Sequence, residues 1–146
     1  MSIDALLSWT LFIPLLAVVG IVVFGRNENL REASSLIAAA VLFGLVYTLF
    51  GHFQGGAEIA VSWIEILPGL DIAFKVETTG MVFALIASSL WFVTVLYAIG
   101  YMRGHSEQNQ TRFYACFAVA ISAVMGIAFA ENLFTLFVFY EVLSLC

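Results

Sequence analysis

The sequence predicts an all-α integral membrane protein with four complete transmembrane helices, a truncated fifth helix, and a small outward-facing β-hairpin between helices two and three. Three observations predict this fold class. Hydrophobic residues make up 63% of the 146 residues and charged residues only 10%, whereas soluble domains are about half apolar and about a quarter charged. The apolar residues stand in long unbroken blocks, which are typical of membrane spans rather than of a larger core. A short stretch of alternating polarity interrupts the blocks.

Each of the first four apolar blocks holds the roughly twenty apolar positions that a bilayer core requires. Pro14 lies within the first block, where a membrane helix tolerates it because neighbouring groups satisfy the freed carbonyl. The fifth block begins at Asn132 and reaches the last residue before it is long enough to cross. We find no linker, repeat or low-complexity segment, and therefore expect residues 1–146 to form a single transmembrane unit. The predicted spans cover residues 6–24, 33–53, 79–102, 112–130 and 132–146.

The segment 55–78 differs from the blocks around it. It holds two short runs, EIAVSWIEI and LDIAFKVET, on either side of the turn pair Pro68 and Gly69. The second run alternates well between apolar and polar residues, and the first alternates weakly. This pattern predicts a β-hairpin lying on the membrane surface.

The basic residues predict the orientation. The loop after the first span holds Arg26 and Arg31, and the loop after the third holds Arg103 and Arg112, whereas the hairpin holds only Lys75. Because basic residues favour the cytoplasmic side, the first and third loops are predicted to be cytoplasmic. The N-terminus and the hairpin then face outward, and we expect a multi-pass protein of the cell inner (plasma) membrane.

Glu141 is the strongest candidate functional residue. It interrupts the apolar run NLFTLFVFYEVLSLC nine residues after Asn132, which is about 13 Å along a helix. The hydrocarbon core is about 30 Å thick, so the carboxylate is predicted near its middle, where an acidic residue costs about 3 kcal/mol on insertion scales. A carboxyl group that is neutral when dry and charged beside a cation can relay protons. The competing interpretation is a protonated, hydrogen-bonded group that only joins helices, or a helix that does not span the membrane.

Three weaker candidates have ordinary structural explanations as well. Glu77 precedes the third span, where an acid favours the positive end of the helix dipole and so marks a helix start. Thr94 and Tyr97 fall with Tyr101 on one face of the third span. They are candidates for lining a polar path, but such hydroxyl groups more often bond between helices or anchor the interface.

The fourth span carries small residues at helical spacing, namely Ala115, Ala118, Ser122 and Gly126. Small residues on one face allow membrane helices to approach closely. We interpret this stripe as a packing surface rather than as a site of chemistry.

The segments FKVETTGMVFALIASSLWFVTVLYAIGYM and FYACFAVAISAVMGIAFAENLFTLFVFYEVLSLC resemble a known family. They are similar to the N-terminal part of the proton-conducting antiporter-like subunits of Mrp-type cation/proton antiporters, respiratory NADH:quinone oxidoreductase and membrane-bound hydrogenases. The resemblance is most specific in GYM and in NLFTLFVFYEVLSL, and the latter leans towards the D-type subunit of the Mrp antiporters.

The resemblance implies a role for Glu141. Family members have about fourteen helices and two inverted five-helix repeats. A glutamate of the fifth helix matches Glu141 and is paired in the family with a lysine two helices later, beyond Cys146. The family usually has an aspartate before the third span, and Glu77 departs from it. The resemblance therefore implies one half of an ion-coupling pair.

These observations lead to a first hypothesis and its alternatives. We expect the N-terminal portion of a subunit of a multisubunit monovalent cation/proton antiporter that takes part in proton or cation translocation. A proton-pumping subunit of an NADH:quinone oxidoreductase or hydrogenase complex, or a non-transporting structural membrane subunit, are the alternatives. The expected partners are the lipid bilayer, other membrane subunits, protons and a monovalent cation. No nucleophile, metal cluster or cofactor motif stands out, so we expect no catalysis by this chain, and five scattered basic residues make no nucleic-acid patch.

Overall fold

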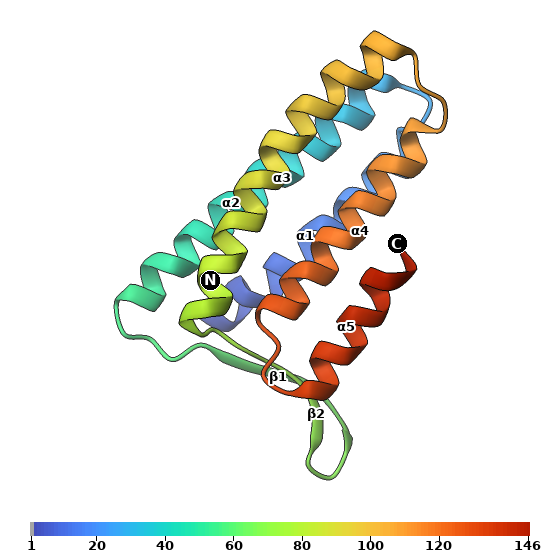
Figure 1. Cartoon of the computed structure of the whole chain (residues 1–146). Helices are drawn as coiled ribbons and strands as arrows, with labels where there is room; N and C mark the ends of the chain where they lie inside the picture. The colour runs from blue at the N-terminus through green and yellow to red at the C-terminus, as the bar shows by residue number, and fades with distance from the viewer. Residues whose placement is uncertain (1) are drawn as a thin grey trace.

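The computed structural model describes residues 2–146 and has five helices and two strands within them. Helices α1 (Ile3–Val23), α2 (Glu28–Gln54), α3 (Thr78–His105) and α4 (Gln110–Ala128) form an antiparallel bundle, beside which α5 (Leu133–Leu145) runs along α4 (Figure 1). Strands β1 (Ala60–Leu67) and β2 (Leu70–Lys75) lie between α2 and α3, at the end of the bundle where α5 begins. The all-α membrane fold with a small hairpin between the second and third helices is therefore confirmed.

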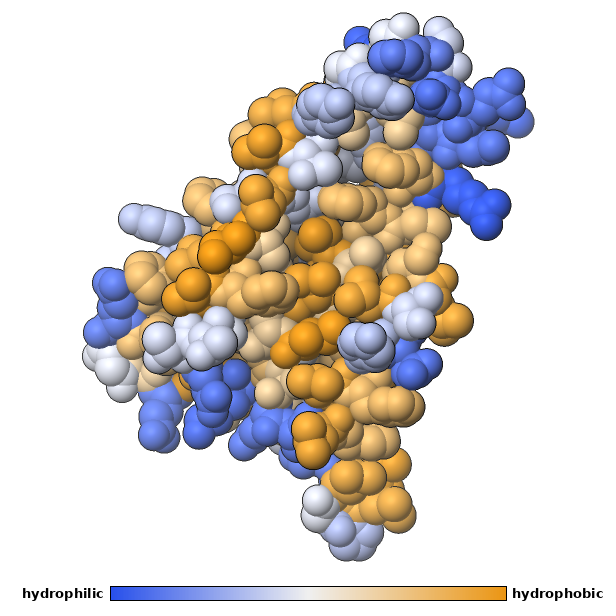
Figure 2. Space-filling model, viewed as in Figure 1, coloured by the Kyte–Doolittle hydropathy of each residue, from blue (hydrophilic) through white to orange (hydrophobic). Residues whose placement is uncertain are grey.

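Within the described residues, α1 to α4 are the four helices that are long and apolar enough to cross a membrane. Between 28% and 39% of the residues in their most apolar windows are buried inside the chain. Most of each helix surface is thus left to face lipid or other protein. Figure 2 shows apolar residues over the middle of the molecule and hydrophilic residues gathered towards both ends of the bundle, as a bilayer requires.

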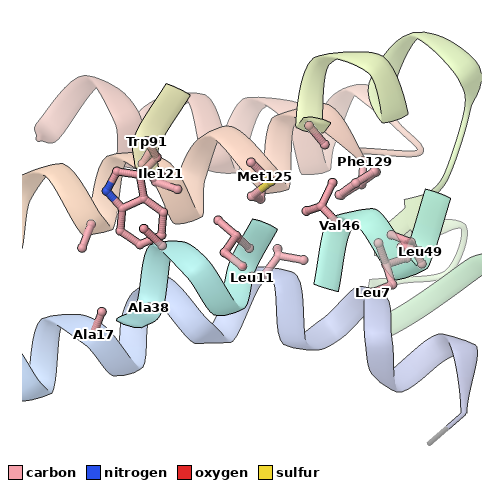
Figure 3. Packing of buried hydrophobic residues seen from close by; sticks show 14 of the residues in the cluster. Leu7, Leu11, Ala17, Ala38, Val46, Leu49, Trp91, Ile121, Met125 and Phe129 are labelled. Carbon is pink, nitrogen blue, oxygen red and sulfur yellow. The ribbon is translucent and has the colours of Figure 1, made fainter. Parts of the chain in front are cut away.

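The bundle core is built from apolar residues of all four long helices. Figure 3 shows Trp91, Ile121 and Ala38 towards one end of the core, Met125 near its middle, and Phe129 and Leu49 towards the other end. α1 continues through Pro14 without a break, as the sequence predicted.

Helix α4 makes its closest contacts through small residues. The Ser122 hydroxyl donates to the Leu11 carbonyl of α1 at 2.8 Å. Gly126 packs so tightly against the Phe139 ring of α5 that a Cβ atom would overlap the ring. This outcome confirms the packing interpretation of the small-residue stripe in the fourth span.

The hairpin is antiparallel and turns at Pro68 and Gly69, where Gly69 has a positive φ of 85° that glycine adopts without strain. The register shifts twice, between Ser62 and Ile64 and between Glu65 and Leu67. Each shift adds one residue to β1, which is the signature of a β-bulge. The bulges explain why the first hairpin run alternates only weakly in the sequence.

The contact between α3 and α4 generates a prediction about Gly80. A Cβ atom at Gly80 would overlap the carbonyl oxygen of Ala128, whereas Gly100, further along α3, has open space around it. We expect Gly80→Ala to lower the melting temperature in detergent, because forced overpacking costs about 1–3 kcal/mol. Gly100→Ala is the control and should raise it, because alanine is favoured over glycine in helices by up to about 1 kcal/mol. Equal melting temperatures for the two variants would contradict the close approach of α3 and α4.

Candidate functional site

The candidate site is centred on Glu141 of α5. Asn132 begins this helix as its N-cap, with its side-chain oxygen accepting the Thr135 amide at 2.8 Å. Apolar residues then continue the helix, and Glu141 follows Leu133 by eight positions, about 12 Å along the axis. The carboxylate of Glu141 therefore lies more than two turns from the start of an apolar helix.

The Glu141 side chain lies on the outer surface of the chain. It is exposed, as are its neighbours Phe137, Tyr140 and Val142. Within residues 2–146 it makes no hydrogen bond and no ion pair with a side chain. The carboxylate therefore faces away from the bundle, on a face that is apolar apart from the hydroxyl groups of Tyr140 and Ser144. Such a face is a costly place for an ionised group at membrane depth.

The start of α5 is fastened to the hairpin. The Asn132 side chain donates to the Asp71 carbonyl at 2.7 Å, and the buried Thr135 hydroxyl accepts the Ala73 amide at 3.1 Å. The turn between α4 and α5 also pairs with β2 through an isolated bridge between Phe74 and Ala130. The hairpin thus contacts the helix that carries Glu141.

A line of aromatic rings continues this attachment across the molecule. Phe12 of α1 stacks on Trp63 with ring centroids 5.1 Å apart, and Trp63 meets Phe74 edge-on at 4.8 Å. Phe74 in turn meets Phe139 of α5 at 5.5 Å. Edge-on and stacked rings stabilise each other beyond their burial, so these contacts join α1 to α5 through the hairpin.

The weaker candidates lie elsewhere. Glu77 is the N-cap residue of α3, which agrees with a helix start, although its side chain makes no cap hydrogen bond. Thr94 is half-buried and Tyr97 is exposed, and Tyr97 stacks on Tyr101. α3 packs against α2 and α4, whereas α5 packs against α4 and β2. Among the described residues, no side-chain bond joins these candidates to Glu141.

A buried polar network at the opposite end of the bundle was missed in the sequence. Arg31 is only 4% exposed and donates to the Gln110 side chain at 2.5 Å and to the Thr111 hydroxyl at 3.2 Å. Glu32, 3% exposed, accepts from Arg103 in an ion pair. Adjacent residues of α2 thereby hold the start of α4 and the end of α3.

Sequence reasoning counted Arg31 and Arg103 only as loop charges that set orientation. The signal that marks the network is a pair of adjacent, oppositely charged residues, Arg31 and Glu32, in the first turns of an apolar span. Neighbouring helical positions point in different directions. One such pair therefore reaches two separate helices.

In the described part of the chain, no three His, Cys, Asp or Glu side chains come together in a way that could hold a metal ion. The titratable groups instead form the separate arrangements described above.

Comparison with known proteins shows which proteins the chain resembles. Residues 63–114 match the family described as the N-terminus of NADH-ubiquinone oxidoreductase (complex I) chain 5. The chain is 29% identical over 112 residues to the A-type Na(+)/H(+) antiporter subunit of Alkalihalophilus pseudofirmus, covering 75% of this chain and 14% of that protein. It is 24% identical to the NAD(P)H-quinone oxidoreductase chain 5 of Picosynechococcus, covering 98% of this chain and 24% of that protein.

A solved structure of an archaeal respiratory membrane complex, the membrane-bound sulfane sulfur reductase, contains a chain with the same fold. The TM-score is 0.77 at 18% identity, and the match covers 93% of this chain and 21% of the other. Together the fold and the matches show that the chain resembles antiporter-like membrane subunits. More particularly, this multi-pass membrane chain is similar to the antiporter-like subunits of Na(+)/H(+) antiporters and quinone oxidoreductases, which confirms the predicted resemblance.

The matches differ from this chain in length, and they do not establish the subunit type. The chain spans 14% and 24% of the length of the two curated relatives named above. The matching antiporter proteins of Alkalihalophilus pseudofirmus and Staphylococcus aureus are both of the A type, so the expected likeness to the D type stays a prediction.

The polar network generates a prediction about the Glu32–Arg103 pair. Removing Arg103 leaves the Glu32 carboxylate buried without its cation, whereas removing Glu32 leaves a half-exposed guanidinium that water can solvate. We expect Arg103→Leu to lower the melting temperature in detergent more than Glu32→Gln does. The Glu32→Leu/Arg103→Leu double variant should recover part of the loss. Arg112→Leu, an exposed site, controls for loss of surface charge, and a larger loss with Glu32→Gln than with Arg103→Leu would contradict this account.

Proposed function

We propose that this chain forms the N-terminal part of a membrane subunit that translocates protons or monovalent cations, with Glu141 on the ion path. The observation that carries the proposal is the Glu141 carboxylate on the exposed, mainly apolar face of α5. A cation that approaches this face stabilises the ionised form, and its withdrawal favours the neutral form. Alternation between the two states moves a proton.

The relatives support this assignment. Proteins named Na(+)/H(+) antiporter and NAD(P)H-quinone oxidoreductase match the chain over most of its length. The partner cation in this proposal is a lysine on a helix outside residues 1–146, as the family resemblance implies. The chain then acts as a transport component within a larger set of membrane subunits.

A second candidate function is proton pumping in a redox-driven complex. The match to a quinone oxidoreductase chain 5 covers 98% of this chain, against 75% for the antiporter. Purification of the intact complex distinguishes the two functions. Quinone-dependent proton uptake by the purified complex favours the second, and exchange driven by a sodium or potassium gradient alone favours the first.

The orientation in this proposal places the network of Arg31 and Arg103 on the cytoplasmic side of the plasma membrane and the hairpin outside, following the distribution of basic residues. We expect a cysteine at Gly104, in a background lacking Cys116 and Cys146, to resist an impermeant thiol reagent added to intact cells. A cysteine at Gly69, in the hairpin turn, should react. Labelling of the Gly104→Cys variant from outside would reverse the orientation.

Replacement of Glu141 tests the central proposal. In the complete transport assembly, Glu141→Gln keeps the shape and hydrogen-bonding ability of the side chain but removes its titratable charge. We expect coupled flux to fall at least tenfold, while Glu141→Asp retains part of it. Insertion and assembly should be normal for both variants, because a neutral amide costs less in a bilayer than an ionised carboxylate and aspartate keeps the carboxyl group.

The matched control is Glu131→Gln, at the exposed start of the α5 region, where water already screens the charge. Flux is measured in vesicles at equal amounts of assembled complex. Normal flux with Glu141→Gln would favour a structural membrane subunit in which this carboxyl group only bonds between helices.

A further inference from the structure

We propose that the hairpin is a positioning element for Glu141, and that Asn132 and Thr135 are the residues through which it acts. The inference rests on the proposed role of Glu141 in transport. It assigns a functional task to a surface segment that the sequence identified only as a hairpin.

Asn132 and Thr135 make more bonds than a helix start requires. A capping residue needs only a side-chain oxygen to accept a free amide, and the Asn132 oxygen does this for Thr135. Its amide group additionally donates to the Asp71 carbonyl at 2.7 Å. The Thr135 hydroxyl accepts the Ala73 amide at 3.1 Å and lies 3.4 Å from the Asp71 carbonyl.

The backbone leading into α5 is held by the same strand. The Lys75 amide donates to the Phe129 carbonyl at 2.8 Å, and the Glu131 amide donates to the Ala73 carbonyl at 3.0 Å. β2 therefore pairs with β1 on one edge and with the α4–α5 connection on the other. These bonds fix the position of the first turn of α5 relative to β2.

Packing at Phe139 fixes the rotation of α5. The Phe139 ring lies against Gly126 of α4 and against the Phe74 ring of β2. Successive residues of a helix are about 100° apart, so Thr135 and Phe139 share one face and Glu141 lies about 200° from Phe139. The contacts that turn Thr135 and Phe139 inward are those that turn Glu141 outward.

Contacts that fix the position and rotation of a helix matter more in a bilayer than in water. The outer face of α5 otherwise consists mainly of Leu, Phe, Val and Tyr, with Ser144 near the end of the helix. Lipid tails do not favour one rotation of these apolar side chains over another. Directional hydrogen bonds to the hairpin supply that preference. A small rotation or slip of α5 would move the carboxylate away from its partner, with a large effect on transfer.

The test measures the position of Glu141 separately from transport. Dicyclohexylcarbodiimide, an apolar reagent that modifies membrane carboxyl groups, is applied to the complete assembly, and labelling of Glu141 is followed by mass spectrometry. Glu107, exposed at the opposite end of the bundle, is the internal reference. Thr135→Val keeps the side-chain shape but removes the hydroxyl, and Asn132→Ser keeps a capping oxygen but removes the donor to Asp71.

We expect both variants to change the labelling rate of Glu141 at least threefold and to reduce coupled flux with an altered pH profile, at unchanged amounts of assembled complex. Thr135→Ser, which retains the hydroxyl, should restore values close to those of the unmodified protein. Labelling and flux that are unchanged in both Thr135→Val and Asn132→Ser would overturn the proposal.

The outcomes also separate this inference from the proposed function. If Glu141→Gln leaves flux normal but Thr135→Val still changes labelling, the hairpin positions the carboxyl group and the transport role fails. If Glu141→Gln abolishes flux while the hairpin variants behave normally in both measurements, the transport role stands and positioning by the hairpin fails.

Discussion

Close approach to α4 is the constraint on which the rest of the structure depends. α4 packs against α1, α3 and α5, and each of these contacts requires an absent or short side chain. Ser122 meets the α1 backbone, Gly126 accommodates the Phe139 ring, and Gly80 of α3 meets the backbone at Ala128. In lipid, apolar burial alone does not draw helices together, so this steric fit and the few polar bonds must do so. The placement of α5, and with it Glu141, follows from the fit at Gly126.

Polar contacts complete the bundle at its two ends by different means. At one end, the neighbouring side chains of Arg31 and Glu32 diverge to hold α4 and α3. At the other, the hairpin holds α5 through backbone groups of β2 and the side chains of Asn132 and Thr135. Between the two ends the buried polar bonds are few, and the Ser122 hydroxyl on the Leu11 carbonyl is one of them.

The sequence predicted the spans, the hairpin and the packing face of the fourth helix because each leaves a local pattern. Unbroken apolar blocks, alternation around Pro68 and Gly69, and small residues three or four positions apart can all be recognised without knowing which residues they contact. The Arg31–Gln110 bond could not be read this way, since its partners are 79 residues apart. The same applies to Thr135, an unremarkable residue in an apolar run whose hydroxyl partner, the Ala73 amide, is 62 residues away. Glu141 could be identified from the sequence because a carboxylate within an apolar run has an evident cost of insertion into a bilayer. The side of α5 on which it lies depends on how Phe139 packs, and only the structure shows that.

The pairing of β2 with the α4–α5 connection has a consequence for biogenesis. The Ala73 and Lys75 amides find their partners at Thr135 and Phe129, about sixty residues later in the chain. During synthesis the hairpin is therefore made before α4 and α5, and this edge of β2 lacks its partners within the chain until they follow. An open strand edge is a template for pairing with the wrong partner. When α4 and α5 dock after α3, the backbone between them pairs with that edge. The step that assembles the fourth and fifth helices is therefore also the step that protects the hairpin.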